Sequence, residues 1–259
     1  MSAARRTRLD DALIERGLAG AADRALALIM AGDVLVNGQV QIKADYPVTA
    51  ADAIAVQEKH PYVSRGAFKL AKAIDAFAIR VAGAKVLDLG ISTGGFSDYL
   101  LQRGADRVCG VDVNISQVDY GLRQNPRLAL LKKNARFLRP QDIPFEPDLI
   151  LMDLSFISIT MVLPVLSGFA KAKILALVKP QFEAPKPLVG RGGVIRDAGT
   201  RLDVVLALKQ RIENMGFAVR GFTPAGLKGK KGNQEYFFLL EFGKKKSIDD
   251  TMIRDEAAV

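Results

Sequence analysis

The sequence is poor in the side chains that most often build disulfides, metal sites and histidine-activated nucleophiles. Its 259 residues include one cysteine, Cys109, and one histidine, His60. A single cysteine excludes an internal disulfide and fits a reducing, cytosolic compartment. His60 lies in a predicted linker and Cys109 in the middle of a predicted strand, so we expect neither a histidine-activated nucleophile nor a metal site.

Long apolar segments are also scarce. The N-terminus, MSAARRTRLDD, has no apolar run of signal-peptide length. The longest uncharged stretch, residues 154–170, approaches the roughly 18 to 20 residues of a membrane span, but it contains Pro164, Gly168 and several hydroxyl side chains. We interpret it as a strand end, a turn and a core helix, and we expect a soluble, cytoplasmic protein that makes no membrane contact.

Acidic residues are too few to balance the basic ones. The net charge is +9 and the sequence pI is about 9.6. Residues 1–60 carry 7 Lys/Arg against 8 Asp/Glu, so the excess belongs mainly to the rest of the chain. A basic excess of this size favours a polyanionic partner such as RNA. The N-terminal tip is an exception, with predicted RNA contacts at Arg5, Arg6 and Arg8.

Residues 1–59 are predicted to form a small α+β domain. Apolar residues at helical spacing predict two helices before Gly32. Asn37-Gly38 then separates two alternating apolar segments. This is the strongest short signal for a β-hairpin, because both positions of a type I′ turn need positive φ. A closing strand is predicted at 53–56, and residues 60–63 form the predicted linker.

Residues 64–243 alternate between predicted strands and helices, which indicates a mostly parallel α/β sheet. The predicted strands are 85–89, 107–111, 128–131, 148–152, 173–178, 218–222 and 234–242. The predicted helices are 66–80, 95–103, 116–122, 159–169 and 200–215. No helix separates the last two strands, so the final one should run antiparallel. Residues 244–259 form a charged tail that we expect to be frayed.

A glycine-rich turn follows the first predicted strand of this domain. Gly90, Gly94 and Gly95 have the spacing G-x-x-x-G-G, which differs from the G-x-G-x-x-G of nicotinamide enzymes and lacks the Lys-Ser/Thr of a phosphate loop. Asp88 would repel a diphosphate but suits an ammonium group, such as the amino-acid end of S-adenosylmethionine. Asp112, at the end of the next strand, could accept both ribose hydroxyls. The alternative is a plain βα turn with a capping Asp.

Four charged residues are predicted to meet near this turn. Asp153 and Lys179 end the fourth and fifth predicted strands, and the ends of parallel strands face one crevice. Lys69 lies on the first helix of the domain, and Glu235 opens the last strand. The chemistry that fits these residues is methylation of a ribose 2′-hydroxyl, in which a lysine assists proton loss and the two acids orient both lysines.

A lysine-rich loop precedes Glu235. Lys228, Lys230 and Lys231 lie between glycines, and we expect them to border the cleft and contact RNA phosphates. The alternative is a solvated loop without a ligand. Arg65, just before the first helix of the domain, is a further predicted RNA contact.

Together these motifs resemble the TlyA family of bacterial rRNA 2′-O-methyltransferases, which are also described as haemolysins. The resemblance covers residues 8–242. It rests on Val63–Gly66, the glycine-rich turn, Asp153–Ser158, Val178–Glu183, Gly192–Asp197 and Gly232–Tyr236, in that order. It implies a ribosomal-protein-type RNA-binding domain followed by an FtsJ-like catalytic domain with the Rossmann-like sheet of class I methyltransferases.

The resemblance also implies roles for individual residues. Lys69, Asp153, Lys179 and Glu235 match the family's Lys-Asp-Lys-Glu tetrad. The implied S-adenosylmethionine contacts are Asp88, Gly90, Ser92, Thr93, Gly94, Gly95, Phe96, Asp112 and Asn134. The implied substrates are cytidines of rRNA in the small or large ribosomal subunit.

Three departures from the family pattern stand out. Ile91 replaces a small residue, which would tighten the glycine-rich turn. Ala21-Ala22-Asp23 replaces a Ser-Arg-rich helix start, and Asp33 replaces a basic residue. These acids would weaken phosphate binding by the N-terminal domain, which could instead recognise RNA shape through a few basic contacts.

Three other functions compete with methylation. A membrane-acting haemolysin needs a spanning or amphipathic segment, and the sequence offers no convincing one. A pseudouridine synthase can carry the same N-terminal domain, and Arg8-Leu9-Asp10 is similar to its catalytic motif, but here this triplet begins the first helix. An RNA-binding protein with an inactive site is disfavoured by the intact tetrad and turn. The sequence does not indicate an oligomeric state.

Overall fold

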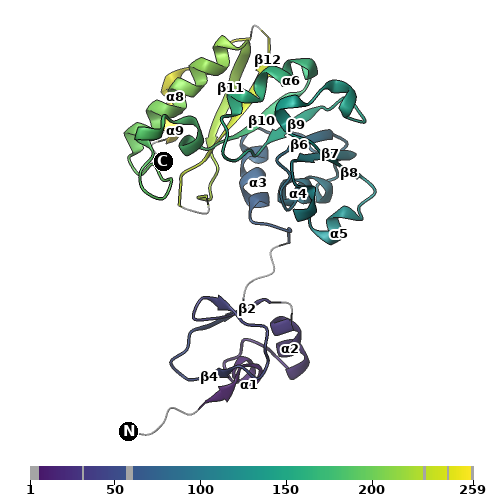
Figure 1. Ribbon diagram of the computed structural model, residues 1–259, viewed down its shortest axis with the longest axis vertical. Coiled ribbons are helices and arrows are strands. Elements are labelled where there is room, and N and C mark those ends of the chain that lie inside the picture. Colours follow the sequence, from purple (N-terminus) through teal and green to yellow (C-terminus); the bar gives the residue numbers. More distant parts are fainter. Residues whose placement is uncertain (1–5, 31, 57–60, 230–231, 244, 258–259) are drawn as a thin grey trace. The chain divides into compact units, whose positions relative to one another are not determined.

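The computed structural model describes residues 6–30, 32–56, 61–229, 232–243 and 245–257. The chain divides into two compact units, Met1–Pro61 and Tyr62–Val259 (Figure 1). The N-terminal unit has one hydrophobic core of its own, and the C-terminal unit has two core clusters.

The N-terminal unit is a small α+β domain with two helices. They are α1 (Leu9–Glu15) and α2 (Ala22–Met30). Its strands are β1 (Thr7–Arg8), β2 (Val34–Val36), β3 (Gln39–Val40), β4 (Pro47–Val48) and β5 (Ile54–Val56). β2 pairs with β3 and β5, and β1 pairs with β4, all antiparallel. The predicted hairpin turn is confirmed, because Asn37 and Gly38 have φ of 52° and 80°.

The C-terminal unit is built on a seven-stranded sheet in the order β11-β12-β10-β9-β6-β7-β8. The strands are β6 (Lys85–Leu89), β7 (Arg107–Asp112), β8 (Leu128–Lys132), β9 (Leu149–Met152), β10 (Lys173–Val178), β11 (Phe217–Pro224) and β12 (Tyr236–Phe242). β8, β7, β6, β9 and β10 are parallel neighbours, whereas β12 is antiparallel to both β10 and β11. The predicted mostly parallel sheet with an antiparallel strand is therefore confirmed.

Helices cover both faces of this sheet. The α-helices are α3 (Gly66–Ala76), α4 (Gly95–Gln102), α5 (Tyr120–Arg123), α6 (Leu163–Leu166), α7 (Pro180–Glu183), α8 (Ala198–Asn214) and α9 (Asp250–Ala257). The 3₁₀ helices are η1 (Ile115–Gln117), η2 (Ala135–Phe137), η3 (Pro140–Asp142), η4 (Ile159–Met161), η5 (Ser167–Phe169) and η6 (Lys186–Leu188). Residues of α3 and α4 pack in one core cluster, and residues of α6 and α8 pack in the other.

Three predicted segments differ from the structure. The continuous helices expected at 116–122 and 159–169 are each broken into short α and 3₁₀ turns. Pro164, near the start of α6, lacks the N–H that a longer helix would need. The expectation of a frayed tail is wrong, because the tail contains α9, whose Ile253 is fully buried against the main core cluster. Asp250 of α9 also pairs with Lys209 of α8 at 3.0 Å.

The chain changes direction across the sheet at β6. β7 and β8 are added on one side of β6, and β9 and β10 on the other. Ligands of open α/β sheets bind beyond the carboxyl ends of the strands at such a switch point. The glycine-rich turn after β6 lies there.

Candidate active site

The glycine-rich turn has a backbone that favours glycine at two positions. Gly90 has φ 86°, and a Cβ atom there would lie 2.4 Å from the carbonyl oxygen of Asp153. Gly94 has φ 98° and is the N-cap of α4. Glycine at position 90 avoids this clash, and glycine at both positions adopts the positive φ without strain. Ser92 and Thr93 between them are exposed, so a ligand can reach them and the first N–H groups of α4.

Asp112 ties the end of β7 to this turn. Its Oδ2 accepts a hydrogen bond from the backbone N–H of Ser92 at 3.1 Å, and its Oδ1 accepts one from Asn114 N–H at 3.0 Å. Carboxylate oxygens have further lone pairs that could accept ribose hydroxyls. Asn134 follows β8 on the same edge of the sheet, where its exposed side chain caps η2 by accepting from Arg136 N–H at 3.0 Å. Cofactor contacts by Asp112 and Asn134 stay predictions.

Asp88 and Phe96 lie beneath the turn rather than on its open face. Asp88 is 1% exposed, and its Oδ2 accepts a hydrogen bond from the Ser97 hydroxyl at 2.6 Å. Burial removes water from this carboxyl and raises the pKa of Asp88 to about 7. Phe96 is also buried, and its ring packs 6.2 Å from that of Phe237. Only the backbone of Phe96 can therefore face a ligand.

The chemistry of this turn suits a ligand that carries an ammonium group and a ribose. Oδ1 of the buried Asp88 has no hydrogen-bond partner in the part of the chain that the structure describes, so an acceptor oxygen lies beneath the turn, where its carboxyl group favours a positively charged group bound above it. Asp112 offers a second acceptor at the next strand end. A diphosphate would instead meet two carboxyl groups. The donor and acceptor set therefore fits S-adenosylmethionine.

The side chain of Ile91, the residue expected to tighten the turn, points into the core. The side chain is 4% exposed and belongs to the core cluster between the sheet and α4. It packs over Gly110 of β7, where an added Cβ would lie 2.2 Å from Ile91 Cδ1. The missing side chain at Gly110 thus leaves room for Ile91 to point inward.

The register of the sheet brings the four predicted charged residues to one edge. Val178 pairs with Tyr236 in the antiparallel β10–β12 ladder, which places the next residue of β10, Lys179, beside Glu235. The backbone N–H of Asp153 donates to Leu89 O at 2.9 Å. Asp153 is thereby held next to the glycine-rich turn.

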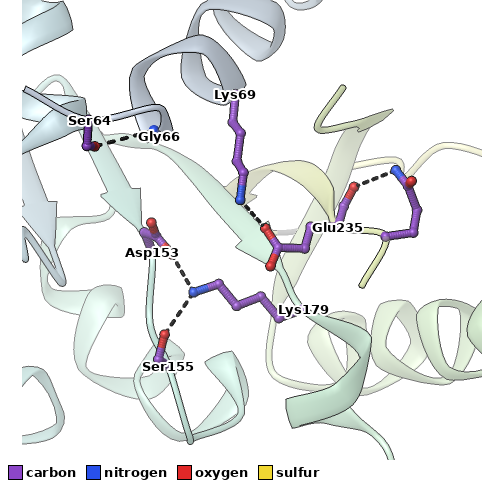
Figure 2. A network of polar contacts seen from close by, with 8 residues as sticks. Ser64, Gly66, Lys69, Asp153, Ser155, Lys179 and Glu235 are labelled. Carbon is purple, nitrogen blue, oxygen red and sulfur yellow. Dashed lines mark hydrogen bonds and ion pairs between the residues drawn. The ribbon is translucent and has the colours of Figure 1, made fainter. Parts of the chain in front are cut away.

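The four residues form two ion pairs (Figure 2). Lys69 Nζ lies 2.6 Å from Glu235 Oε2, and Lys179 Nζ lies 2.6 Å from Asp153 Oδ1. The Lys179 amine also donates to the Ser155 hydroxyl at 2.9 Å. Glu235 is the most enclosed side chain, at 5% exposure, and Asp153 is the most open, at 30%. Two lysines thus balance two acids, and Asp153 is the more exposed of the two carboxylates.

Two residues beside Lys179 were not predicted from the sequence to belong to the site. Ser155 is a hydrogen-bond partner of the amine, and Phe156 presents a ring that is 87% exposed from a backbone with φ 68°. The Phe156 ring contacts that of Phe182 at 5.3 Å, and Lys179 Nζ lies 6.0 Å from the Phe182 ring centroid. An exposed ring here gives an unstacked base a surface to stack on. The only signal in the sequence was their place in the Asp153–Ser158 block.

Asn233 joins three segments around Glu235. Its side chain is buried, donates to Gly193 O at 2.8 Å and accepts from Ile195 N–H at 3.1 Å. Its backbone carbonyl accepts from Gly229 N–H at 2.9 Å. Two sequence blocks that are far apart in the chain, Gly192–Asp197 and Gly232–Tyr236, are therefore one structural feature.

The predicted RNA contacts are only partly within the described residues. Arg6, Arg65 and Lys228 are exposed, whereas Arg8 is ion-paired with Asp10 at 2.7 Å. Arg5, Lys230 and Lys231 lie outside the described residues. The lysine-rich loop does pass against the site, because a Cβ on Gly229 would lie 2.4 Å from Glu235 Oε1.

The described ranges offer neither a metal site nor a membrane-spanning helix. Among those residues, no group of three or more His, Cys, Asp or Glu side chains is arranged to hold a metal ion. None of the helices in the same ranges has the length and apolar character needed to cross a bilayer.

Known proteins share both the sequence and the fold. Residues 62–242 match the model of the FtsJ-like methyltransferase family. A Mycobacterium tuberculosis protein named 16S/23S rRNA (cytidine-2′-O)-methyltransferase TlyA is 45% identical, over 92% of this chain and 90% of that protein. Hemolysin A of Brachyspira hyodysenteriae is 37% identical, over 88% and 97%. The structure of a candidate hemolysin from Streptococcus thermophilus superimposes with a TM-score of 0.74 at 33% identity, covering 99% of this chain and 96% of that one. The chain belongs to the TlyA family of FtsJ-like methyltransferases.

Proposed function

We propose that this chain transfers a methyl group from S-adenosylmethionine to the 2′-hydroxyl of a cytidine ribose in rRNA. The observation that carries the proposal is the Lys179–Asp153 pair, 2.6 Å apart, held directly beside the glycine-rich turn. A base that assists proton loss must lie within hydrogen-bond reach of the reacting hydroxyl. The relative from M. tuberculosis is named for this reaction.

Three parts of the site would hold the cofactor. Asp88 would lie beneath its ammonium group and attract it by charge, the turn from Gly90 to Gly95 would lie along its amino-acid end, and Asp112 would accept from its ribose. When bound, S-adenosylmethionine supplies an electrophilic methyl group on a positively charged sulfur that leaves as a neutral thioether.

The charged residues would act on the ribose hydroxyl. Its proton must leave while the oxygen bonds to the methyl carbon, and we assign Lys179 as the group that accepts it. Asp153 and Ser155 orient the Lys179 amine. Lys69, held by Glu235, places a positive charge near the oxygen as it becomes negative, which is the usual form of electrostatic stabilisation in enzymes.

RNA recognition would be shared between the two units. Residues 1–59 form the proposed RNA-binding domain, which offers the exposed Arg6. On the catalytic unit, Arg65 precedes α3, the helix that carries Lys69, and Lys228 lies in the loop that passes against Glu235. Both are exposed and could bind phosphates on either side of the target nucleotide.

The proposal is tested by transfer of tritium from labelled cofactor to isolated ribosomal subunits, followed by mapping of the 2′-O-methyl position. Lys179→Ala should lose most turnover while it still binds the cofactor by calorimetry. Lys179→Arg should not recover activity, because a guanidinium keeps its proton. Methylation near the wild-type rate by the arginine variant would reduce Lys179 to a positioning group. Absence of 2′-O-methyl transfer by the wild type to either subunit would refute the function itself.

A further inference from the structure

A buried carboxylate outside the tetrad holds the far end of the loop that follows β9. Glu183 is the last residue of α7, and its side chain is 1% exposed. Its Oε1 accepts a hydrogen bond from Ile159 N–H at 2.8 Å, and its Oε2 accepts one from the Ser158 hydroxyl at 2.5 Å. Both carboxylate oxygens are therefore used to fix the start of η4.

The loop between β9 and η4 is joined to α7 at both of its ends. At the near end, Asp153 and Ser155 contact Lys179, the N-cap residue of α7. At the far end, Ser158 contacts Glu183, the last residue of that helix. Because α7 is a single helical turn, the two contacts fix both ends of the loop to one short, rigid element.

The loop needs an anchor because its backbone is strained between these two ends. Phe156 has φ 68°, a conformation that non-glycine residues keep only where the surroundings impose it. Its ring is 87% exposed, so burial of the side chain does little to hold the strained backbone. The hydrogen bonds to Glu183 begin two residues later and can supply that restraint.

Burying the Glu183 carboxylate costs free energy, which indicates that its two acceptor oxygens are needed at this place. Loss of water around the carboxylate raises its pKa, an effect that the bonds from Ser158 and Ile159 oppose. The nearest cation is Arg211 of α8, whose Nη2 lies 3.6 Å from Oε2 and whose side chain is 44% exposed. An apolar side chain could fill this volume without that cost, but it could not hold the two donors of the loop.

We propose that Glu183 is a positioning residue for methyl transfer, because it holds the loop that keeps Asp153 in contact with Lys179. The inference rests on the proposed function, since it assigns Glu183 a part in that reaction. Glu183 acts here through the loop, not by touching substrate or cofactor.

The test compares Glu183→Gln with the wild type and with Glu213→Gln as a matched control. Glutamine keeps the size of the side chain but replaces one acceptor oxygen with an amide donor, so the Ser158 hydroxyl can no longer donate to it, and both contacts lose the strengthening that a charged acceptor gives. Glu213 is an ion-paired carboxylate of α8, 3.0 Å from Lys209 Nζ, and it has no hydrogen bond to the loop. We expect the single-turnover rate of Glu183→Gln at saturating rRNA to fall about ten- to hundred-fold, as for misplaced reacting groups. Its cofactor affinity should be unchanged, and Glu213→Gln should keep the wild-type rate.

A second variant tests the same contact from its other side, in case Glu183→Gln does not fold properly. Ser158→Ala removes one of the same hydrogen bonds and should also slow single-turnover transfer. The double variant should lose less than the product of the two single losses, because both act through one contact. In both single variants, amide hydrogen exchange over residues 153–161 should be faster than in the wild type.

Several results would overturn the proposal. One is a wild-type rate for Glu183→Gln. Another is a joint fall in rate, cofactor affinity and thermal stability, which is how a general structural residue behaves. Unchanged hydrogen exchange over residues 153–161 is a third. If the wild type does not methylate ribosomal subunits, the proposed function fails, and the exchange measurement alone then decides whether Glu183 anchors the loop.

Discussion

Asp88 should make the stability of the catalytic unit depend on pH. Burial, and secondarily the negative charges of Asp153 and Asp112, raises its pKa from 3.8 to about 7. The folded carboxyl therefore keeps its proton to higher pH than the unfolded one. The resulting stabilisation is fully present below pH 3.8 and is lost as pH rises through about 7. A shift of about three pKa units corresponds to about 4 kcal/mol.

The perturbation is Asp88→Asn, which keeps the shape and the contact with Ser97 but removes the titration. Urea unfolding of both proteins at a series of pH values gives the difference in their unfolding free energies, in which all other groups cancel. We expect this difference to move by up to about 4 kcal/mol in favour of the asparagine variant between pH 4 and pH 8. Parallel stability curves would refute the reasoning, because they would mean that the carboxyl titrates alike in the folded and unfolded chains.

The same group links stability to cofactor binding. An ammonium group bound at the turn above Asp88 favours the charged form of its carboxyl group. With a pKa of about 7, the free protein at pH 7 holds about half a proton on this group, so binding should release up to that amount. Calorimetry in two buffers of different ionisation enthalpy measures the release, and Asp88→Asn should abolish it. Equal proton release by both proteins would separate Asp88 from the cofactor.

Three further variants test other parts of the site. Asp112→Ala removes the acceptor of two backbone N–H groups as well as the predicted ribose contact. Calorimetry should therefore show cofactor affinity reduced about tenfold or more. Asp106→Ala, which changes an exposed aspartate, is the control. Phe156→Leu should raise KM for RNA and leave cofactor affinity unchanged, because stacking of a base on an aromatic ring contributes about 1–3 kcal/mol. An unchanged KM would mean that no base stacks on Phe156. Replacing Lys228, Lys230 and Lys231 with Ala should weaken RNA binding and lower its salt slope by roughly one per lost phosphate contact, whereas an identical slope would indicate a solvated loop.

The fold was largely predictable because the parallel strands are short apolar runs separated by helices. The failures have local causes. The tail was expected to be frayed because Ile248 and Ile253 are isolated among charged residues, and only their contact with the core makes α9 stable. The helix expected at 159–169 contains Pro164, whose effect on where the helix would break could not be judged from periodicity alone.

The site was predictable as a set of residues but not as a set of contacts. Strand ends of a parallel sheet face one crevice, so the sequence could place Asp153 and Lys179 together. Which acid pairs with which lysine depends on the β10–β12 register, which periodicity does not fix. The sequence also could not predict that the Asp88 side chain is buried. Both faces of β6 are covered, so the strand has no alternation of polar and apolar residues that would show which way each side chain points. Glu183 gave no signal as an anchor, because its donors are 24 and 25 positions away in the chain.

The place of β12 in the sheet has a consequence for protein synthesis. β12 is the last strand among the described residues, yet it lies between β10 and β11, and Glu235, just before it, is 166 positions from its partner Lys69. The glycine-rich turn and its neighbouring strands can therefore form on the nascent chain well before the catalytic cluster exists. A chain that terminates before β12 would keep the cofactor turn, lack Glu235 and expose the edge of β10, which favours aggregation. A nonsense mutation just before β12 should thus be as damaging as one early in the chain, and newly made molecules should gain activity only after β12 has been synthesised.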